Sequence, residues 1–450
     1  MARAKKETAL TPEERLQAAL VPDWEWPYKL PENWCWTRHN SIMDIVGGAQ
    51  PEKAFFIRES KEGYVQLYQT RDYGENPVPV YIPQKYATKT TDEGDILLAR
   101  YGGSLGKVFR AHKGAYNVAL AKVIILYPEV VDDEFLYLYY YSHFYQDFCI
   151  KAGYGRSAQA GFNKSDLNEL LFPLPPFIEQ QRIVDRIESL FAKLDEAEEK
   201  AQAVVDSFET RKAAILHKAF TGELTAKWRK EHGVGMESWE VRTLDSVCSS
   251  IFDGDHMPPP KAESGIPFLV ISNVNTGHLT FENTRFVPQE YYDTLSDTRK
   301  PQLGDVLYTL VGSFGIPVVV NSKRPFCFQR HMALLRPIDV SPQFLWYILQ
   351  TPEMYDKASS IATGTAQLTV PIKGLRAMTI PRPNIAEQVE IVRILDGFFA
   401  REQSAKEAAE AVLDQINLMK KSILARAFRG ELGTNDPSEE SAVELLKQII

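Results

Sequence analysis

The sequence predicts an α+β protein that is built twice, with two mixed α/β globular domains, each followed by one long helix. Three observations support this prediction. The second half of the chain repeats the first, two segments carry a helical heptad pattern, and the stretches before them hold short β-like runs between turn residues. With 450 residues, 44% of them hydrophobic, the chain is long enough to build more than one core.

The repeat is clearest in two segments that align without a gap. Residues 179–224 match residues 387–432 at a constant offset of 208, which is 387 minus 179. The stretches upstream match more loosely, as in Gly103-Ser104-Leu105-Gly106 and Gly312-Ser313-Phe314-Gly315. Two copies of a sequence diverge where they do different tasks and agree where they do the same one. We therefore expect two different targets and one shared scaffold.

Each constant segment carries apolar residues at alternating steps of three and four, which is the pattern of a coiled-coil seam. The first seam includes Arg211, and Glu402 is the one charged interruption of the second. We expect the helices to pair with each other as an antiparallel coiled coil with one globular domain at each end, although each could instead pack on its own domain. The residues expected to pair them are Ile183, Ile187, Leu190, Leu194, Phe208 and Ile215, with Ile391, Leu395, Phe398, Val412, Ile416 and Ile423.

These patterns set the predicted domain limits. In chain order they are an N-terminal extension (1–23), the first globular domain (24–178), the first helix (179–220), a linker (221–235), the second globular domain (236–386), the second helix (387–428) and a C-terminal tail (429–450). Aromatic residues between Phe135 and Tyr145 recur at helical spacing. That spacing favours packing in a core over a platform for stacking bases.

Composition argues against several classes of protein. We find no secretory signal and no run of about 18 apolar residues, so we expect a cytoplasmic chain without a membrane partner. The cysteines form no CxxC pair, which argues against zinc and disulfides; they are Cys35, Cys149, Cys248 and Cys327. The formal charge of −8 is unfavourable for DNA binding, so a local basic face or a partner would have to supply positive charge.

The motifs indicate no catalytic centre. Residues 102–108 resemble a phosphate loop, but the glycine spacing is wrong and Val108 stands where Ser or Thr would bind Mg²⁺. We find no Asn-Pro-Pro-Tyr motif of an amino-methyltransferase. Residues 252–256, Phe-Asp-Gly-Asp-His, have metal-ligand chemistry, but a polar turn is the favoured interpretation. We therefore expect no catalytic residue, no metal site and no cofactor bound by the chain itself.

Two motifs open and close each constant segment. Pro-Leu-Pro-Pro-x-x-Glu-Gln-x-x-Ile-Val stands at 173–184 with a copy at 381–392, and Ile-Leu-x-x-Ala-Phe-x-Gly-Glu-Leu stands at 215–224 and 423–432. With these motifs and the duplication, the chain resembles the specificity subunits of type I restriction-modification enzymes over nearly its whole length. The ends, 1–23 and 437–450, depart most from the family, so the sequence does not predict how they dock.

The resemblance implies that each globular domain is a target recognition domain, reading one half of an asymmetric, interrupted double-stranded DNA site. The helices would then fix the gap between the halves. It also implies two methyltransferase subunits, which carry S-adenosylmethionine and methylate adenine, and two motor-nuclease subunits, which use ATP and Mg. The chain itself would be a non-catalytic part of this phage-defence system.

Candidate DNA contacts lie in loops that correspond between the two copies but differ in detail. Arg and Gln can make bidentate contacts to guanine and adenine, and glycine lets a backbone approach the duplex, although the same residues can simply form solvated turns. In the first copy the candidates are Arg100, Tyr101, Gly103, Ser104, Lys107, Tyr154, Arg156, Ser157 and Gln159. In the second they are Thr309, Gly312, Ser313, Phe314, Arg330, His331, Gly364, Thr365 and Gln367.

Two other functions compete with this interpretation. One is a coiled-coil scaffold whose globular ends bind proteins, which salt-sensitive, sequence-specific DNA binding would exclude. The other is a self-sufficient DNA-modifying enzyme, against which the missing methylation and nuclease motifs argue.

Overall fold

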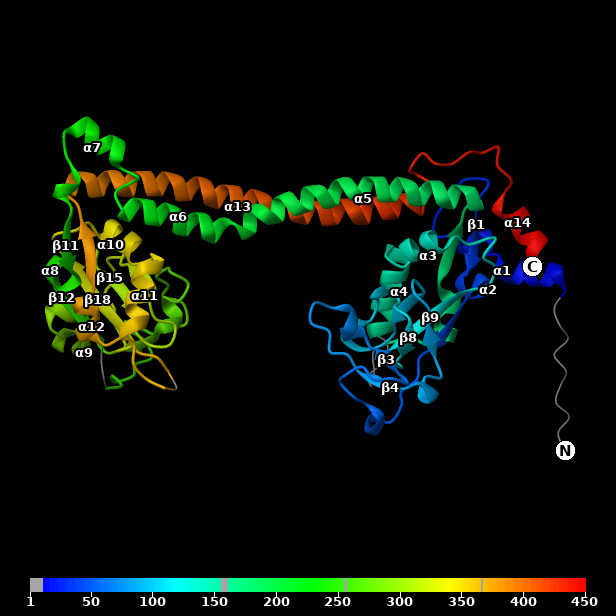
Figure 1. Ribbon diagram of the computed structural model, residues 1–450, viewed down its shortest axis with the longest axis horizontal. Helices are drawn as coiled ribbons and strands as arrows, with labels where there is room; N and C mark the ends of the chain where they lie inside the picture. Colours follow the sequence, from blue (N-terminus) through cyan, green and yellow to red (C-terminus); the bar gives the residue numbers. More distant parts are fainter. Residues whose placement is uncertain (1–10, 155–160, 255–256, 366) are drawn as a thin grey trace. The chain divides into compact units, whose positions relative to one another are not determined.

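The computed structural model describes residues 11–154, 161–254, 257–365 and 367–450. The chain forms two compact units. Unit 1 comprises Met1–Lys200 with Ala411–Ile450, and unit 2 comprises Ala201–Glu410. Each unit therefore holds one globular domain and a stretch of helix from each half of the chain (Figure 1).

The described part of unit 1 holds two four-stranded sheets and a two-stranded ladder. The first sheet has the order β2 (Met43–Gly47), β9 (Leu120–Ile125), β6 (Ile96–Ala99), β7 (Val108–Arg110), all antiparallel. The second has the order β4 (Tyr81–Pro83), β3 (Tyr64–Tyr68), β8 (Gly114–Tyr116), β5 (Thr90–Thr91), in which β3 and β8 are parallel. The ladder pairs β1 (Cys35–Arg38) with β10 (Leu171–Leu174). The helices of the domain are α1 (Pro12–Ala19), α2 (His39–Ile42), α3 (Asp133–Tyr139) and α4 (His143–Tyr154).

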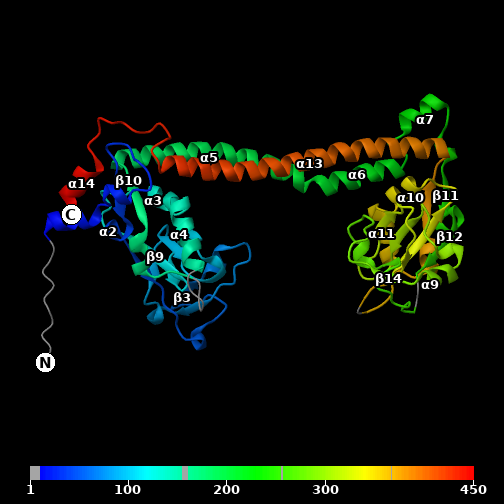
Figure 2. The ribbon, with the colours of Figure 1, turned by 180° about the vertical axis from the view of Figure 1, so that it is seen from behind.

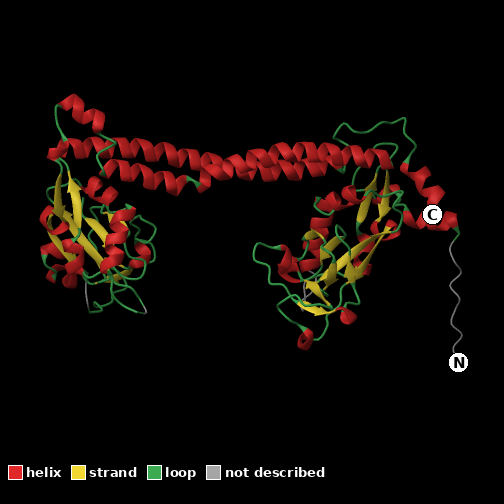
Figure 3. Cartoon of the chain, in the orientation of Figure 1, coloured by secondary structure: helices red, strands yellow, loops and turns green. Residues whose placement is uncertain are grey.

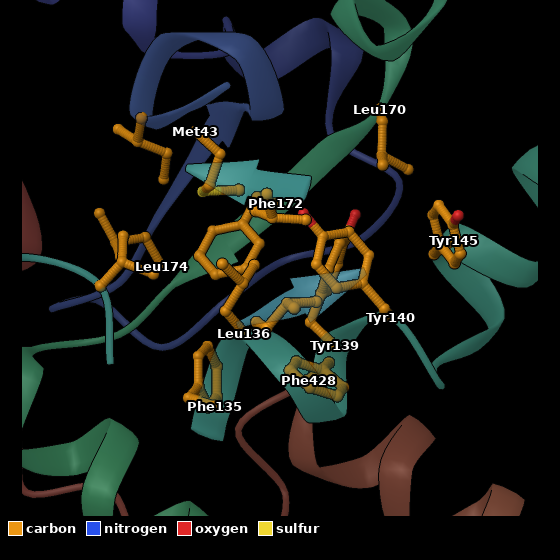
Figure 4. Packing of buried hydrophobic residues seen from close by; sticks show 14 of the residues in the cluster. Met43, Phe135, Leu136, Tyr139, Tyr140, Tyr145, Leu170, Phe172, Leu174 and Phe428 are labelled. Atoms are coloured by element: carbon orange, nitrogen blue, oxygen red, sulfur yellow. The ribbon is translucent and has the colours of Figure 1, made fainter. Parts of the chain in front are cut away.

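The core of unit 1 joins the domain to the far end of the chain. Phe135 and Tyr139 of α3 are fully buried, and both rings contact Phe172 of β10. Both rings also contact Phe428, which directly follows the long helix that ends at Ala427, at centroid distances of 5.1 and 5.6 Å (Figure 4). The aromatic stretch therefore packs in the core, as its helical spacing predicts.

Unit 2 is built from the same parts. Its main sheet has the order β12 (Cys248–Asp253), β18 (Met332–Pro337), β15 (Val306–Thr309), β16 (Pro317–Val319). The second sheet has the order β14 (Arg285–Val287), β13 (Ile266–Leu269), β17 (Cys327–Phe328), and the ladder pairs β11 (Glu240–Thr243) with β19 (Thr379–Arg382). The helices of the domain are α8 (Leu244–Val247), α9 (Gln289–Thr294), α10 (Pro342–Ile348), α11 (Pro352–Ile361) and α12 (Ile372–Ala377).

Apart from β5, which has no counterpart among the described strands of unit 2, the two domains share one topology. The order β2-β9-β6-β7 in unit 1 corresponds to β12-β18-β15-β16 in unit 2, and the parallel pair β3-β8 corresponds to β13-β17. In both units the strands gather in the globular part, apart from the helix pair (Figure 3). The repeat in the sequence is thus a repeat of the mixed α/β fold.

The helices begin and end close to the predicted positions, with one interruption. The first runs as α5 (Phe177–Asp206) and α6 (Phe208–Phe220), and the second is α13 (Ile385–Ala427). The predicted helix 179–220 is therefore broken at Ser207. The Ser207 hydroxyl donates to the Ala203 carbonyl and accepts from the Arg211 guanidinium. Such side-chain bonds to the backbone bend helices, which a heptad pattern does not reveal.

Helix pairing is antiparallel in each unit. In unit 1, Lys420 of α13 lies 2.6 Å from both Asp195 and Glu198 of α5. In unit 2, Arg211 of α6 donates to Glu402 of α13 at 2.7 Å, so the two charged seam residues of the repeat neutralise each other. Figures 1 and 2 show α6 beside α13 from opposite sides.

Most of the residues expected to pair the helices lie in the contact. Ile183, Ile187, Ile391 and Leu395 are fully buried and Ile416 nearly so. Partly buried residues make up most of the rest: Leu190, Leu194, Phe208, Ile215, Phe398 and Ile423. The prediction that Val412 pairs the helices is wrong, because Val412 is 40% exposed and the neighbouring Leu413 is partly buried in its place. A straight helix has 3.6 residues per turn, so a strict 3.5-residue repeat drifts out of the contact along a helix of 43 residues.

A buried glutamate joins each domain to its helix. In unit 2, Oε1 of Glu387 accepts from Arg229 at 2.5 Å and from Thr225 at 2.6 Å, and Oε2 accepts from Trp239 at 3.0 Å. Arg229 and Thr225 belong to the linker, at α7 (Ala226–His232).

The equivalent glutamate of unit 1 uses the C-terminal tail instead of the linker. Oε2 of Glu179 accepts from Trp34 and from Asn435, both at 2.8 Å. Arg182, one turn further along α5, pairs with Glu439 at 2.7 Å. Beyond it, α14 (Ala442–Ile449) packs against α1. The tail thus does for unit 1 what the linker does for unit 2, which settles how the ends of the described chain dock.

Glu179 should give unit 1 a pH-dependent stability. Burial raises the pKa of this carboxyl above its ordinary value of 4.5, so the folded state holds the proton more tightly than the unfolded state. The free energy of unfolding should therefore fall as pH rises from about 4.5 through the raised pKa. Glu179→Gln removes this term. We expect the stability of the wild type relative to E179Q to decline between pH 4.5 and 7.5 in urea titrations; a constant difference would contradict the expectation.

Leu395 should be a principal apolar contact of the helix in unit 2. Its side chain is fully buried, so Leu395→Ala should lower the free energy of unfolding of unit 2 by about 2 to 5 kcal/mol. Val389, 58% exposed on the same helix, gives the matched control Val389→Ala, for which we expect less than about 0.5 kcal/mol. Urea denaturation measures both. Equal effects would mean that the buried face does not hold the helix.

Candidate nucleic-acid interface

Three loops lie side by side at one edge of the main sheet in each unit. In unit 1 the Arg100 amide donates to the Ala119 carbonyl at 2.9 Å, and the Arg100 carbonyl accepts from Phe162 at 3.3 Å. In unit 2, Leu310 donates to the His331 carbonyl at 2.8 Å and accepts from Val370 at 2.9 Å. Backbone bonds therefore hold the same three loops together in both copies. These loops carry most of the residues expected from the sequence to contact DNA.

A glycine anchors a fourth segment against these loops. Gly48 donates to the Leu120 carbonyl and Gly254 to the Met332 carbonyl, so the two glycines are equivalent. A Cβ on either would lie 2.1 Å from a carbonyl oxygen of the adjacent loop, that of Asn117 or Phe328. No side chain fits such an approach, which explains why glycine stands at both positions.

In unit 1, Arg100 and Tyr101 form one packed group. The Arg100 guanidinium lies 4.8 Å from the centre of the Tyr101 ring and donates to its hydroxyl at 3.0 Å. The same Nη2 reaches the Val118 carbonyl at 3.4 Å. Gly103 and Lys107 are exposed and Ser104 is half-buried, close to this group in the chain. Tyr154 ends α4, while Arg156, Ser157 and Gln159 lie outside the described residues.

In unit 2, the predicted residues fall into two sets. Gly312, Ser313, Gly364, Thr365 and Gln367 are exposed. Two of the loops meet there, because Gly312 donates to the Leu368 carbonyl at 3.0 Å and a Cβ on Gly312 would lie 2.9 Å from Nε2 of Gln367. Arg330 is exposed and His331 half-buried on the neighbouring loop.

Thr309 and Phe314 are corrections to the predicted contacts. Thr309 is 1% exposed, and its hydroxyl organises the turn by donating to the Ser313 carbonyl and accepting from the Ile316 amide. Phe314 is 7% exposed and stacks on Tyr355. Neither side chain can reach a duplex. Sequence alone could not separate these internal positions from the exposed tips beside them, because all lie within one short loop.

The structure also moves the register of the glycine loops. The isolated bridges of Tyr101 with Gly161 and of Val311 with Thr369 are equivalent, so Gly102 corresponds to Gly312. Both have positive φ, 69° and 72°. The sequence motifs instead pair Gly103 with Gly312. The loop of unit 2 is one residue shorter than that of unit 1, and the missing residue lies after Gly312, not before it.

His331, on the loop after β17, has a shifted pKa. Burial lowers the pKa of His331 below its ordinary value, and the neighbouring Arg330 charge adds to this shift. Neutral imidazole can then donate or accept a hydrogen bond. Among the described residues, no cluster of His, Cys, Asp and Glu could hold a metal ion, and no helix is long and apolar enough to cross a membrane.

The repeat also appears in a comparison with known families. The model of the type I restriction modification DNA specificity domain matches residues 31–206 and, a second time, residues 236–413. The chain belongs to this family. Each match to the specificity domain covers one globular domain and the beginning of the helix that follows it. As a specificity subunit of a type I restriction-modification system, the chain is a non-catalytic component.

Full-length relatives agree with this assignment to the specificity subunits. The EcoKI specificity subunit of Escherichia coli (strain K12) is 25% identical over 458 residues, covering 94% of this chain and 96% of that subunit. The MjaVIII specificity subunit of Methanocaldococcus jannaschii is 25% identical over 422 residues, covering 90% and 94%.

Solved structures share the fold. The HsdS subunit of Thermoanaerobacter tengcongensis is 22% identical with a TM-score of 0.59, covering 90% of this chain and 99% of that one. A chain from a structural study of complex assembly and conformational transition in the type I R-M system has a TM-score of 0.70 at 22% identity, covering 90% and 100%.

Gly254 should be essential for the loop arrangement of unit 2. Gly254→Ala forces a methyl group against the Phe328 carbonyl, so we expect a loss of about 1 to 3 kcal/mol in the free energy of unfolding. Gly397 lies within α13 with nothing near its Cβ position. Gly397→Ala should therefore stabilise unit 2 by up to about 1 kcal/mol. Thermal denaturation of the two variants should shift in opposite directions; a neutral Gly254→Ala would show that the close approach is not required.

Proposed function

We propose that this specificity subunit recognises an asymmetric DNA sequence in two parts, one part bound by each unit. It acts in the cytoplasm as the DNA-reading component of the complex. The observation that carries the proposal is the repeated loop cluster. Equivalent backbone hydrogen bonds join its loops in both units, while its side chains differ.

The difference in side chains supports two different half-sites. Arg100 in unit 1 corresponds to Leu310 in unit 2, because both bridge the same two neighbouring loops through their backbones. Leu310 is buried, with 3% of the residue exposed, whereas Arg100 is half-buried and its Nη2 donates to the Tyr101 hydroxyl and the Val118 carbonyl. On the neighbouring loop of unit 2, Arg330 is exposed, and an exposed arginine can distinguish guanine from other bases in the major groove.

The helix pair supports the second part of the proposal, in which the subunit holds two methyltransferase and two motor-nuclease subunits. On α13 in unit 1, Leu418 is 65% exposed and Met419 is 50% exposed. Exposed apolar residues on a helix that already pairs on one face suit a protein partner. S-adenosylmethionine, ATP and Mg would then belong to these partners, and the paired helices would set the gap between the half-sites.

Methylation in cells tests this function. The chain, produced with a cognate methyltransferase subunit in a host without adenine methylation, should yield methylated adenine within one two-part motif. The chain alone should yield none. In binding assays with the assembled subunits, affinity for that motif should fall steeply with salt, because phosphate contacts release counterions.

Two results would contradict the proposal. Methylation by the chain alone, in a preparation free of partners, would make it an enzyme. Binding that ignores DNA sequence and salt while a protein partner is retained would support a coiled-coil scaffold.

A further inference from the structure

A basic cavity of about 280 Å³ lies beside the loop cluster of unit 2. Its walls are the segment 257–261, the hairpin of β13 and β14, and the loop that follows β17. The polar side chains that line it are Lys261, Arg285, Gln329, Arg330 and His331. The last three are consecutive, so one loop presents three groups that can form hydrogen bonds with base edges.

Two arginines of this cavity differ from the ion-paired arginines of unit 2. Arg336 pairs with Asp305 at 2.9 Å and Arg382 with Asp339 at 2.6 Å. Within the described part of the chain, Arg285 and Arg330 are exposed and have no hydrogen-bonded or ion-paired side-chain partner. Two guanidinium groups without a partner at one hollow favour an anionic ligand that supplies several acceptors.

Unit 1 has a cavity that shares two of these walls, the segment after Gly48 and the connection between β3 and β4. Its volume is about 760 Å³, and its polar lining residues are Gln50, Glu52, Lys53, Arg58, Gln69 and Arg71. Nε2 of Gln69 is buried without a hydrogen-bond partner among the described residues. Both hollows are largely basic, but of the two only that of unit 2 is lined by residues of the loop after the parallel strand.

The loop after the parallel strand shows what distinguishes the copies. Tyr116 corresponds to Phe328 and Leu120 to Met332 by strand register, so Val118 corresponds to Arg330. Val118 carries no polar group, but the Arg100 guanidinium reaches its carbonyl from the next loop. In unit 2 the guanidinium of Arg330 is therefore exposed on this loop, whereas in unit 1 the guanidinium of Arg100 is bonded within the protein, with Nη2 donating to Tyr101 and Val118 and Nε buried.

We propose that Arg330 reads a guanine in the half-site of unit 2, and that Arg285 and Lys261 bind phosphates at the same cavity. The assignment rests on the proposed function. Arg330 stands between Gln329 and His331 and next to the exposed Gly312 loop, where base edges would be contacted. Arg285 lies on the edge strand β14 and not on one of the three loops, so we assign it a contact with the DNA backbone.

Selection from a random duplex library tests these roles with the full-length chain assembled with its methyltransferase. Arg330→Lys keeps the charge but loses the fork that binds O6 and N7 of guanine. We expect the preference for one guanine in one half-site to fall roughly 5- to 150-fold, while the other half-site stays unchanged. Arg242→Lys, the matched control at an exposed arginine of β11 that pairs with Glu240, should change neither half-site.

Arg285→Ala should behave differently from Arg330→Lys. We expect it to weaken binding about equally for all sequences and to reduce the slope of log affinity against log salt by about one. If Arg330→Lys leaves both half-sites unchanged, or weakens all sequences equally, Arg330 is not a base-reading residue although the proposed function stands. If the wild-type complex selects no two-part sequence, both the proposed function and this assignment are wrong. Thermal denaturation checks that each variant is folded.

Discussion

A buried carboxylate at the junction between domain and helix is the interaction on which the rest of each unit depends. Glu179 and Glu387 occupy the same position of the repeat, and each accepts from the indole of a tryptophan in its own domain, Trp34 or Trp239. A buried carboxylate is unfavourable unless donors surround it, so these bonds fix which segments must come together. The domain, the helix and a third segment meet at this one group. The junction therefore helps to fix the domain, and the loop cluster that it carries, on the helix.

The two junctions reach the same end by different chemistry. Glu387 is neutralised by Arg229, which is itself 7% exposed. Glu179 has amide, hydroxyl and indole donors but no cation in direct contact among the described residues, and burial raises its pKa. Removing one partner from the ion pair of unit 2 would leave a buried charge, whereas unit 1 can respond by taking up a proton. The repeat therefore conserves the glutamate and its tryptophan while the remaining donors vary.

The fold could be predicted from the sequence because its signals are periodic or duplicated. The offset of 208 between Glu179 and Glu387 identifies the two copies, and the heptad pattern locates both helices. The site was predicted less well, because exposure within a short loop depends on neighbours far away in the sequence. Thr309 and Phe314 are residue types that can contact DNA. Their contacts with Ile316 and Tyr355 nevertheless bury both side chains within unit 2. Lys261 and Arg285 were missed because no motif surrounds them, and only the sheet pairing brings them to the cavity of Arg330.

The C-terminal tail determines which unit can be completed first during synthesis of the chain. Unit 2 is one continuous segment, Ala201–Glu410, so all its parts leave the ribosome together. Unit 1 begins first but waits for Ala411–Ile450, which includes Phe428 of its core and Asn435 at its junction. The domain made first is therefore completed last, against the usual N-terminal-first order of domain folding. A chain released from translation after Glu410 would contain all of unit 2, whereas its unit 1 would lack Phe428 in the core and Asn435 at the junction.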